Sequence, residues 1–221
     1  MKNPEFITFT GADDGTNLLD LADFSRAYSA ELGILFSPKR AGSARYPTLA
    51  WTGRLIKTIV GPLSAHICGD YSRALLRGER LPDEIELLLE SRFDRVQINT
   101  AEPNIPVGRL SAWAASLGLQ LILQCRDTFP EDNRAQWLFD RSGGRGEQPE
   151  HWPVPHPDMP GPVGYAGGIG PANVLDTLNR ITTSLPFWID MESGVRNAED
   201  RFDIGRCRAV CEAVYQREMV A

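Results

Sequence analysis

Short apolar runs alternate with stretches of helical periodicity along the whole chain. Eight runs have the length and composition of buried strands, and they occupy residues 6–10, 32–36, 63–68, 95–99, 119–125, 137–140, 163–167 and 187–191. Between most of these runs, apolar residues recur on one helical face, as at Leu110, Trp113, Ala114 and Leu117. Proline is favoured in the first turn of a helix, so Pro171 predicts that a helix begins within residues 170–175.

Eight strands that alternate with helices predict parallel βαβ units. Within 221 residues this pattern favours a single (β/α)8 TIM barrel that spans residues 1–221. An open doubly wound sheet is the alternative, but its glycine fingerprint usually follows the first strand. The clearest glycine turns of this chain follow the sixth, seventh and eighth strands, which favours the barrel.

One segment interrupts the alternation. Residues 147–162 contain six prolines, which remove backbone donors and clash inside helices. We therefore predict that an extended loop replaces the sixth helix. Two interpretations of this loop stay open: a stiff surface connection, and a lid or oligomer contact.

The barrel model predicts an unusually polar interior near the carboxyl ends of the strands. Successive side chains of a strand alternate between the barrel interior and the helices. The polar residues predicted to point inward are Thr8, Thr10, Ser64, His66, Cys68, Gln97, Asn99, Gln124, Arg126, Asp140 and Asp190. Buried polar groups cost stability unless they are paired, so this cluster indicates either a functional site or an internal hydrogen-bond network.

The three glycine turns predict a phosphate site. They lie in "DRSGGRG" (140–146), "YAGGIGPANVL" (165–175) and "DMESGVR" (190–196). Backbone without side chains lets N–H groups approach an anion, and the N-terminus of a following helix adds a favourable partial charge. Barrel enzymes commonly bind phosphate in the loops after strands seven and eight.

Composition narrows the range of partners. The net charge of −6 argues against nucleic acid and acidic membranes, which usually require a basic face. The four cysteines form no CxxC pair, so neither a metal site nor a disulfide framework is expected. Without an apolar signal region or a membrane-length apolar run, the expectation is a cytoplasmic protein, monomeric or homodimeric, that uses no cofactor.

Six motifs in order along nearly the whole chain resemble one family, phosphoribosylanthranilate isomerase of tryptophan biosynthesis. "LFDRSGGRG" resembles the family's "LLD…GGTG", "YAGGIGPANV" resembles "LAGGL.P.NV", and "WIDMESGVR" followed by "RFD" resembles "VDVSSGVE" followed by "KD". Upstream, "FDRVQINT" is similar to "LDVVQLHG" and "LFSPKRAGSARY" to "F.P.SPRY", while "TFTGADD" occupies the place of "KICGIT". The last two strands carry the most specific matches.

The resemblance implies a (β/α)8 barrel that binds a phosphorylated sugar-derived ligand and catalyses an aldose–ketose isomerisation of the Amadori type. It assigns Asp140 as the general acid and Arg45 as the ligand of the anthranilate carboxylate. It assigns the phosphate to the turns that contain Gly143, Gly144, Gly167, Gly168, Ser193 and Gly194. From its position, Asp190 either supports the phosphate loop, which is the favoured interpretation, or caps local backbone. An aspartic acid in the acid role needs a raised pKa, through burial or nearby negative charge.

The proton-transfer residues depart from the family pattern. Thr10 stands where the family has its basic cysteine, and a threonine hydroxyl has no useful basicity unless an adjacent base activates it. Cys68 is the first candidate for a relocated base. His66 and a loop carboxylate, Asp13 or Asp14, are the next candidates, and each of these residues also has an ordinary structural interpretation.

Three hypotheses about function therefore remain at the level of sequence. The first is the family isomerisation with a relocated base. The second is a different reaction on a related phosphosugar. The third is a binding protein that kept the phosphate anchors and lost catalysis.

Overall fold

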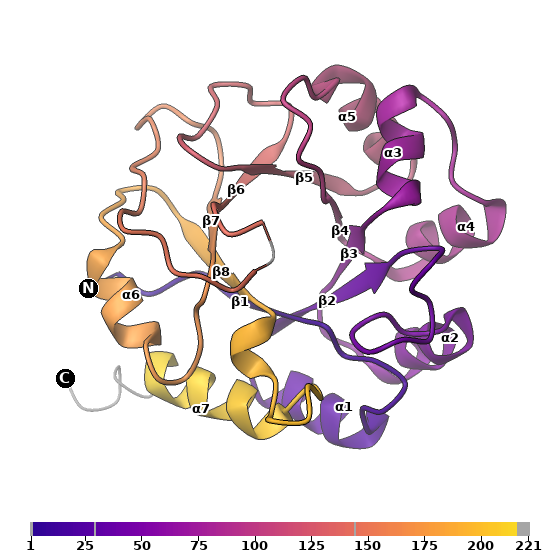
Figure 1. The fold of residues 1–221 in the computed structure, drawn as a ribbon, viewed down its shortest axis with the longest axis horizontal. Helices are drawn as coiled ribbons and strands as arrows, with labels where there is room; N and C mark the ends of the chain where they lie inside the picture. The colour runs from indigo at the N-terminus through magenta and orange to yellow at the C-terminus, as the bar shows by residue number, and fades with distance from the viewer. Residues whose placement is uncertain (1, 29, 144, 216–221) are drawn as a thin grey trace.

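Eight parallel strands close into one barrel in the computed structural model, which describes residues 2–28, 30–143 and 145–215 (Figure 1). Each strand pairs with the next along the chain, and the eighth pairs with the first. The strands are β1 (Ile7–Thr10), β2 (Ala30–Phe36), β3 (Leu63–Ile67), β4 (Arg95–Ile98), β5 (Gln120–Cys125), β6 (Gln136–Asp140), β7 (Val163–Ala166) and β8 (Phe187–Met191). The (β/α)8 barrel and all eight predicted strands are confirmed.

Helices surround most of the barrel (Figure 1). They are α1 (Leu18–Ala27), α2 (Leu49–Thr58), α3 (Asp70–Arg77), α4 (Asp83–Arg92), α5 (Val107–Ser116), α6 (Val174–Arg180) and α7 (Ile204–Tyr215), with a short 3-10 helix η1 (Ser193–Val195) after β8. Side-chain caps begin two of them: Asn17 accepts hydrogen bonds from the first turn of α1, and Thr48 does so for α2. Helix α6 begins at Val174, so Pro171 lies in the turn just before it.

Two strand connections contain no helix among their described residues, the one between β5 and β6 and the one between β6 and β7. The second confirms the predicted loss of the sixth helix. Trp152 fills part of the missing helix's place, because its ring packs edge-on against Phe139 of β6 and Tyr165 of β7. The Tyr165 hydroxyl also donates to the Pro153 carbonyl oxygen at 2.9 Å. The proline-rich loop therefore covers the outer wall of the barrel at β6 and β7.

The amino end of the barrel interior holds a buried ion pair. The Arg95 guanidinium donates to both carboxylate oxygens of Glu31, at 2.6 and 2.8 Å, and the Thr8 hydroxyl donates to Glu31 at 2.8 Å. The guanidinium also lies 4.6 Å from the Phe6 ring centroid and 4.5 Å from that of Trp188. Because hydrogen bonds satisfy both charges, the pair can be buried here.

The opposite faces of the strands supply the main core. Leu63, Ala65 and Ile67 of β3 are fully buried in the apolar layer between strands and helices, as the alternation predicts. No helix in the described part of the chain is long and apolar enough to cross a membrane.

Candidate functional site

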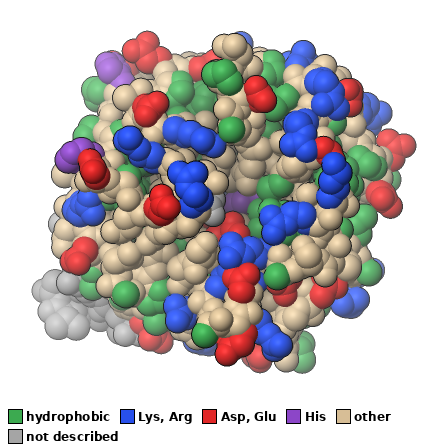
Figure 2. Space-filling model, viewed as in Figure 1, with side chains coloured by type: hydrophobic (Ala, Val, Ile, Leu, Met, Phe, Trp, Pro, Cys, Tyr) green, Lys and Arg blue, Asp and Glu red, His purple; other side chains and the backbone are tan. Residues whose placement is uncertain are grey.

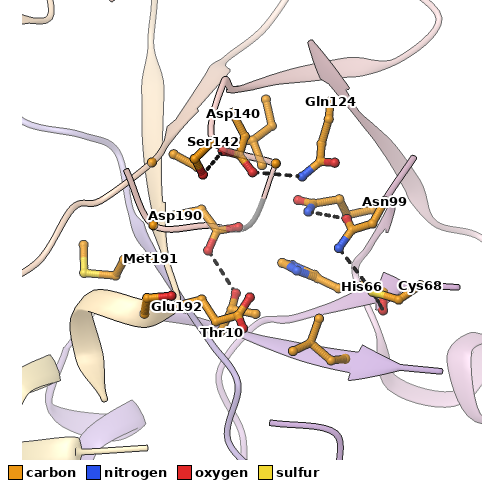
Figure 3. Close-up of a pocket in the computed structure, with 18 of the residues that line it drawn as sticks. Thr10, His66, Cys68, Asn99, Gln124, Asp140, Ser142, Asp190, Met191 and Glu192 are labelled. Atoms are coloured by element: carbon orange, nitrogen blue, oxygen red, sulfur yellow. Dashed lines mark hydrogen bonds between the residues drawn. The ribbon is translucent and has the colours of Figure 1, made fainter. Parts of the chain in front are cut away.

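A pocket of about 420 Å³ opens where the strands end (Figures 2 and 3). The polar residues predicted to point inward there do line it: Thr10, His66, Cys68, Gln97, Asn99, Gln124, Arg126, Asp140 and Asp190. Thr8 and Ser64 are also buried but are not among the lining residues, because they lie nearer the amino ends of their strands. The alternation of strand residues therefore predicted the lining of the pocket correctly.

The glycine turns converge on one side of this pocket. The turns after β6, β7 and β8 contribute Gly143, Gly146, Gly167, Gly168 and Gly194, while Gly144 lies outside the described residues. A Cβ added to Gly168 would lie 2.8 Å from the Gly146 carbonyl oxygen, and one added to Gly194 would lie 2.0 Å from the Ile169 carbonyl oxygen. Glycine is required because backbone packs directly on backbone between the turns.

These turns present unused hydrogen-bond donors. Within the described residues, the backbone N–H groups of Gly167, Gly168, Ser193 and Gly194 donate to no protein acceptor. All four residues line the pocket. Backbone N–H groups without protein partners in glycine-rich turns are suited to bind an anion such as phosphate.

Two carboxyl groups, those of Asp140 and Asp190, lie in the pocket (Figure 3). Asp140 ends β6 and Asp190 lies on β8, the two strands that flank β7. Asp140 accepts hydrogen bonds from the Ser142 hydroxyl at 2.7 Å and the Gln124 amide at 3.4 Å. Asp190 accepts one from the Thr10 hydroxyl at 2.9 Å. Asp140 is 6% exposed and Asp190 is 7% exposed, so both meet solvent only through the pocket.

The pKa of Asp190 lies far above that of an ordinary aspartic acid. Burial raises its pKa to about 8, and the negative charges of Glu192, Glu31 and Asp140 add to the shift, while the Thr10 hydrogen bond opposes it. A carboxyl group with a pKa near the working pH is suited to proton transfer.

Thr10 and His66 approach each other above β2. A Cβ added at Gly33 would lie 2.2 Å from the Thr10 hydroxyl oxygen and 2.9 Å from His66 Nε2. Nε2 is buried and has no hydrogen-bond partner among the described residues. Burial, followed by the positive charge of Arg95, lowers the His66 pKa to about 3, so the imidazole is neutral at physiological pH.

Cys68 lines the opposite wall of the pocket. Burial raises its pKa to about 12, so its thiol stays protonated at neutral pH and is unsuited to act as a base. The Asn99 amide donates to its sulfur at 3.2 Å, and the Gln97 amide donates to the Asn99 oxygen at 2.7 Å. These contacts favour a structural role for Cys68.

Neither loop carboxylate that was considered as a base lines the pocket. Asp14 accepts from the Thr48 backbone N–H at 2.7 Å and from its hydroxyl at 2.6 Å, and so holds the start of α2. Asp13 accepts the Arg45 backbone N–H at 2.8 Å. Both contacts favour structural roles.

Arg45 reaches the pocket, but acidic residues already engage it. Its guanidinium donates to Glu192 at 2.7 Å and to Asp200 at 2.8 Å. Sequence reasoning did not assign Glu192 or Arg40 to the site, yet both line it. For Glu192 a signal was available, since it directly follows β8, whereas Arg40 is one basic residue of a loop.

In the described residues, no group of three or more His, Cys, Asp or Glu side chains is arranged to hold a metal ion. The fold and the pocket define a (β/α)8 barrel that has unpartnered backbone N–H groups and a buried carboxyl pair at the carboxyl face of its strands. This is the face on which enzymes of this fold build their sites.

Part of the chain is similar in sequence to a curated enzyme. A curated N-(5'-phosphoribosyl)anthranilate isomerase of Leptothrix cholodnii is 38% identical over 71 residues, which cover 32% of this chain and 31% of that protein. The match thus spans under a third of the relative's length. No protein-family model matches the chain.

Solved structures of the same enzyme share the fold. Phosphoribosyl anthranilate isomerase from Thermus thermophilus aligns with a TM-score of 0.64 at 21% identity, over 96% of this chain and 98% of that one. The same enzyme in complex with reduced 1-(o-carboxyphenylamino)-1-deoxyribulose 5-phosphate aligns with a TM-score of 0.64 at 16% identity, over 95% and 98%. The curated relative and these structural neighbours are phosphoribosylanthranilate isomerases. This is the family that the sequence motifs of this chain resemble.

Proposed function

We propose that this protein binds a phosphorylated N-glycosylamine and isomerises it by an Amadori rearrangement. The observation that carries the proposal is the group of unpartnered backbone N–H donors on the glycine turns, which share one pocket with two buried carboxyl groups. The donors suit a sugar phosphate, and the carboxyl groups suit proton transfer to and from the sugar. Two further observations support the proposal: the partial match to the curated isomerase, and the six motifs of this chain that resemble that family in the same order.

The chemistry needs one proton donor and one proton acceptor. The donor protonates the ring oxygen, the bond from that oxygen to C1′ breaks, and the nitrogen lone pair forms the C=N bond of an iminium ion. The acceptor then removes the C2′ proton, and the C–H electron pair forms an enolamine. Tautomerisation of the enolamine gives the aminoketose.

We assign Asp140 as the donor and Asp190 as the acceptor. Asp140 ends β6 inside the pocket, where the family motif has its acid. Asp190 lies 2.9 Å from the hydroxyl oxygen of Thr10, the residue at the position of the family's basic cysteine. A pKa of about 8 makes Asp190 a stronger base than an ordinary carboxylate. Thr10 then serves as a positioning residue that orients Asp190.

A fluorescence assay tests this proposal. Phosphoribosylanthranilate is generated in situ, purified protein is added, and the decay of substrate fluorescence is followed. We expect decay with the wild type, and none above background with Asp140→Asn or Asp190→Asn. Both variants should still bind the reduced aminodeoxyribulose phosphate analogue, because the phosphate donors are intact. Unchanged turnover in Asp140→Asn would contradict the acid assignment.

A binding protein without catalysis is the second candidate. The observation that favours it is Thr10, which cannot itself remove a proton from carbon. Saturable binding of the analogue, together with no fluorescence decay at any pH from 6 to 9, would identify this function. A protein that neither binds nor reacts would refute both candidates.

A further inference from the structure

Among the described residues, His66 alone combines a buried, unpartnered polar atom with a place in the pocket. Three buried side-chain atoms there have no hydrogen-bond partner: Ser64 Oγ, His66 Nε2 and Trp152 Nε1. Ser64 lies nearer the amino end of β3 and does not line the pocket, and Trp152 packs on the outer wall of the barrel. A buried polar group without a partner costs stability, so the place of His66 beside a pocket points to a ligand as the partner.

The His66 ring presents one nitrogen to the pocket and turns the other away from it. The ring extends from β3 toward the middle of the pocket (Figure 3). Neither ring nitrogen forms a hydrogen bond with a described residue, and only Nε2 is fully buried, so Nδ1 is the nitrogen that reaches the pocket. Nε2 lies over Gly33, 2.9 Å from the position that a Cβ would take there.

Thr10 favours one of the two neutral forms of the His66 ring. Burial, followed by the charge of Arg95, lowers the His66 pKa to about 3, so only one ring nitrogen carries a proton at neutral pH. The Thr10 hydroxyl oxygen lies 2.2 Å from the same Cβ position at Gly33, and its own proton is donated to Asp190. The lone pairs of this oxygen favour the form with N–H at Nε2. Nδ1 is then a hydrogen-bond acceptor that faces the pocket.

An acceptor at this place suits a sugar hydroxyl. Thr10 lies next to both His66 and Asp190, and the proposed function assigns Asp190 to the C2′ proton. The carbon that loses this proton also carries a hydroxyl group. Because His66 stays neutral, it can accept a hydrogen bond from this hydroxyl without taking its proton.

We propose that Nδ1 of His66 binds the C2′ hydroxyl of the substrate and so selects against 2-deoxy sugars. This inference rests on the proposed function, since that function places the C2′ carbon at Asp190. The substrate class is then a phosphorylated glycosylamine with a free C2′ hydroxyl. Thr10 has two roles in this arrangement, because it orients Asp190 and fixes the proton of His66 on Nε2.

Two probes that differ only at the carbon corresponding to C2′ test the assignment. One is the reduced carboxyphenylamino-deoxyribulose 5-phosphate, which carries a hydroxyl there, and the other has a hydrogen in its place. Calorimetry measures the affinity of each variant for both probes. We expect the wild type to bind the hydroxyl probe about tenfold more tightly than the deoxy probe. His66→Phe should abolish this preference, and His66→Asn, whose amide oxygen lies near the place of Nδ1, should keep part of it.

Ser64→Ala is the matched control, because it removes another buried, unpartnered group from β3 without changing the pocket lining. It should keep the preference of the wild type. Nitrogen-15 NMR gives a second readout, since the chain has three histidines and His66→Phe identifies the signals of His66. The hydroxyl probe should shift the Nδ1 signal of His66, whereas the deoxy probe should leave it in place.

The outcomes separate this inference from the proposed function. If the wild type binds neither probe, the proposed function fails, and this inference fails with it. If the wild type binds both probes equally, or if His66→Phe keeps the preference, only the His66 assignment is overturned. An equal loss for both probes in His66→Phe would mean that His66 supports the pocket without binding the hydroxyl, which also overturns the assignment. Urea unfolding checks that His66→Phe folds, and we expect its stability to equal or exceed that of the wild type because an unpartnered polar group is removed.

Discussion

Gly33 makes room for the residues at the bottom of the pocket. Its backbone lies on β2, and any β carbon there would overlap the Thr10 hydroxyl and press on the His66 ring. We expect Gly33→Ala to destabilise the fold by about 1–3 kcal/mol through overpacking and to lower turnover by displacing Thr10 from Asp190. Urea unfolding and the fluorescence assay measure the two effects.

Gly53 is the matched control for this change. It lies within α2, and a Cβ added there would meet no atom within 4 Å. Gly53→Ala should therefore preserve turnover and stabilise the protein by up to about 1 kcal/mol. Equal behaviour of the two variants would show that contacts above Gly33 do not matter.

Thr10 adjusts the proton affinity of Asp190 through one hydrogen bond. This bond opposes the upward shift of the Asp190 pKa, so Thr10→Val should raise that pKa further. If Asp190 is the base, kcat/KM rises with pH as the carboxyl ionises near pH 8, and the variant moves this rise to higher pH. Thr10→Ser keeps the hydroxyl and should leave the profile in place. A profile from pH 6 to 10 that is the same for Thr10→Val and the wild type would contradict the base assignment.

At the scale of elements, the proline-rich loop stands in place of the sixth helix, and Trp152 packs it against the barrel. Trp152 is 7% exposed and contacts the rings of Phe139 and Tyr165. We expect Trp152→Ala to lower the free energy of unfolding by about 3–5 kcal/mol, because it leaves the outer wall of β6 and β7 uncovered. Denaturant unfolding measures this loss.

Trp152→Phe tests whether ring packing carries the effect. The Trp152 indole N–H is buried without a hydrogen-bond partner in the described residues, so phenylalanine loses no hydrogen bond there. It should retain most of the stability. A loss in Trp152→Phe as large as that in Trp152→Ala would mean that indole size, and not aromatic burial in general, anchors the loop.

At the scale of the whole molecule, two buried titratable groups set how stability depends on pH. The Asp190 pKa rises from 3.8 to about 8 on folding, so between these values only the folded protein holds this proton, and stability falls as pH rises. The His66 pKa falls from 6.5 to about 3, so below pH 6.5 only the unfolded chain gains this proton, and stability falls as pH falls. The two slopes oppose each other between about pH 4 and 6.5.

Of these two groups, Asp190 dominates the pH dependence of the free energy of unfolding between pH 6.5 and 8. We expect the free energy of unfolding to fall by about 2 kcal/mol over this range. Asp190→Asn should remove this slope and make the protein more stable at pH 8, at the expense of turnover. Urea unfolding at both pH values checks the prediction, and a slope that persists in Asp190→Asn would assign it to another group.

The sequence by itself determined the barrel, its strands and the inward polar residues, because period-2 alternation and βαβ order are local properties of the chain. It also placed the loss of the sixth helix in residues 147–162, since proline acts locally. The connection between β5 and β6 contains a single proline, Pro130, and the absence of a helix there was not predicted.

Only the tertiary structure decided which groups meet. The buried pair of Glu31 with Arg95, and the engagement of Arg45 by Glu192 and Asp200, join strands and loops that are distant in sequence. The same is true of the proton affinity of Asp190, which depends on burial and on charges from other strands. Electrostatic interactions act through space over a few ångströms, so spacing along the chain does not encode them.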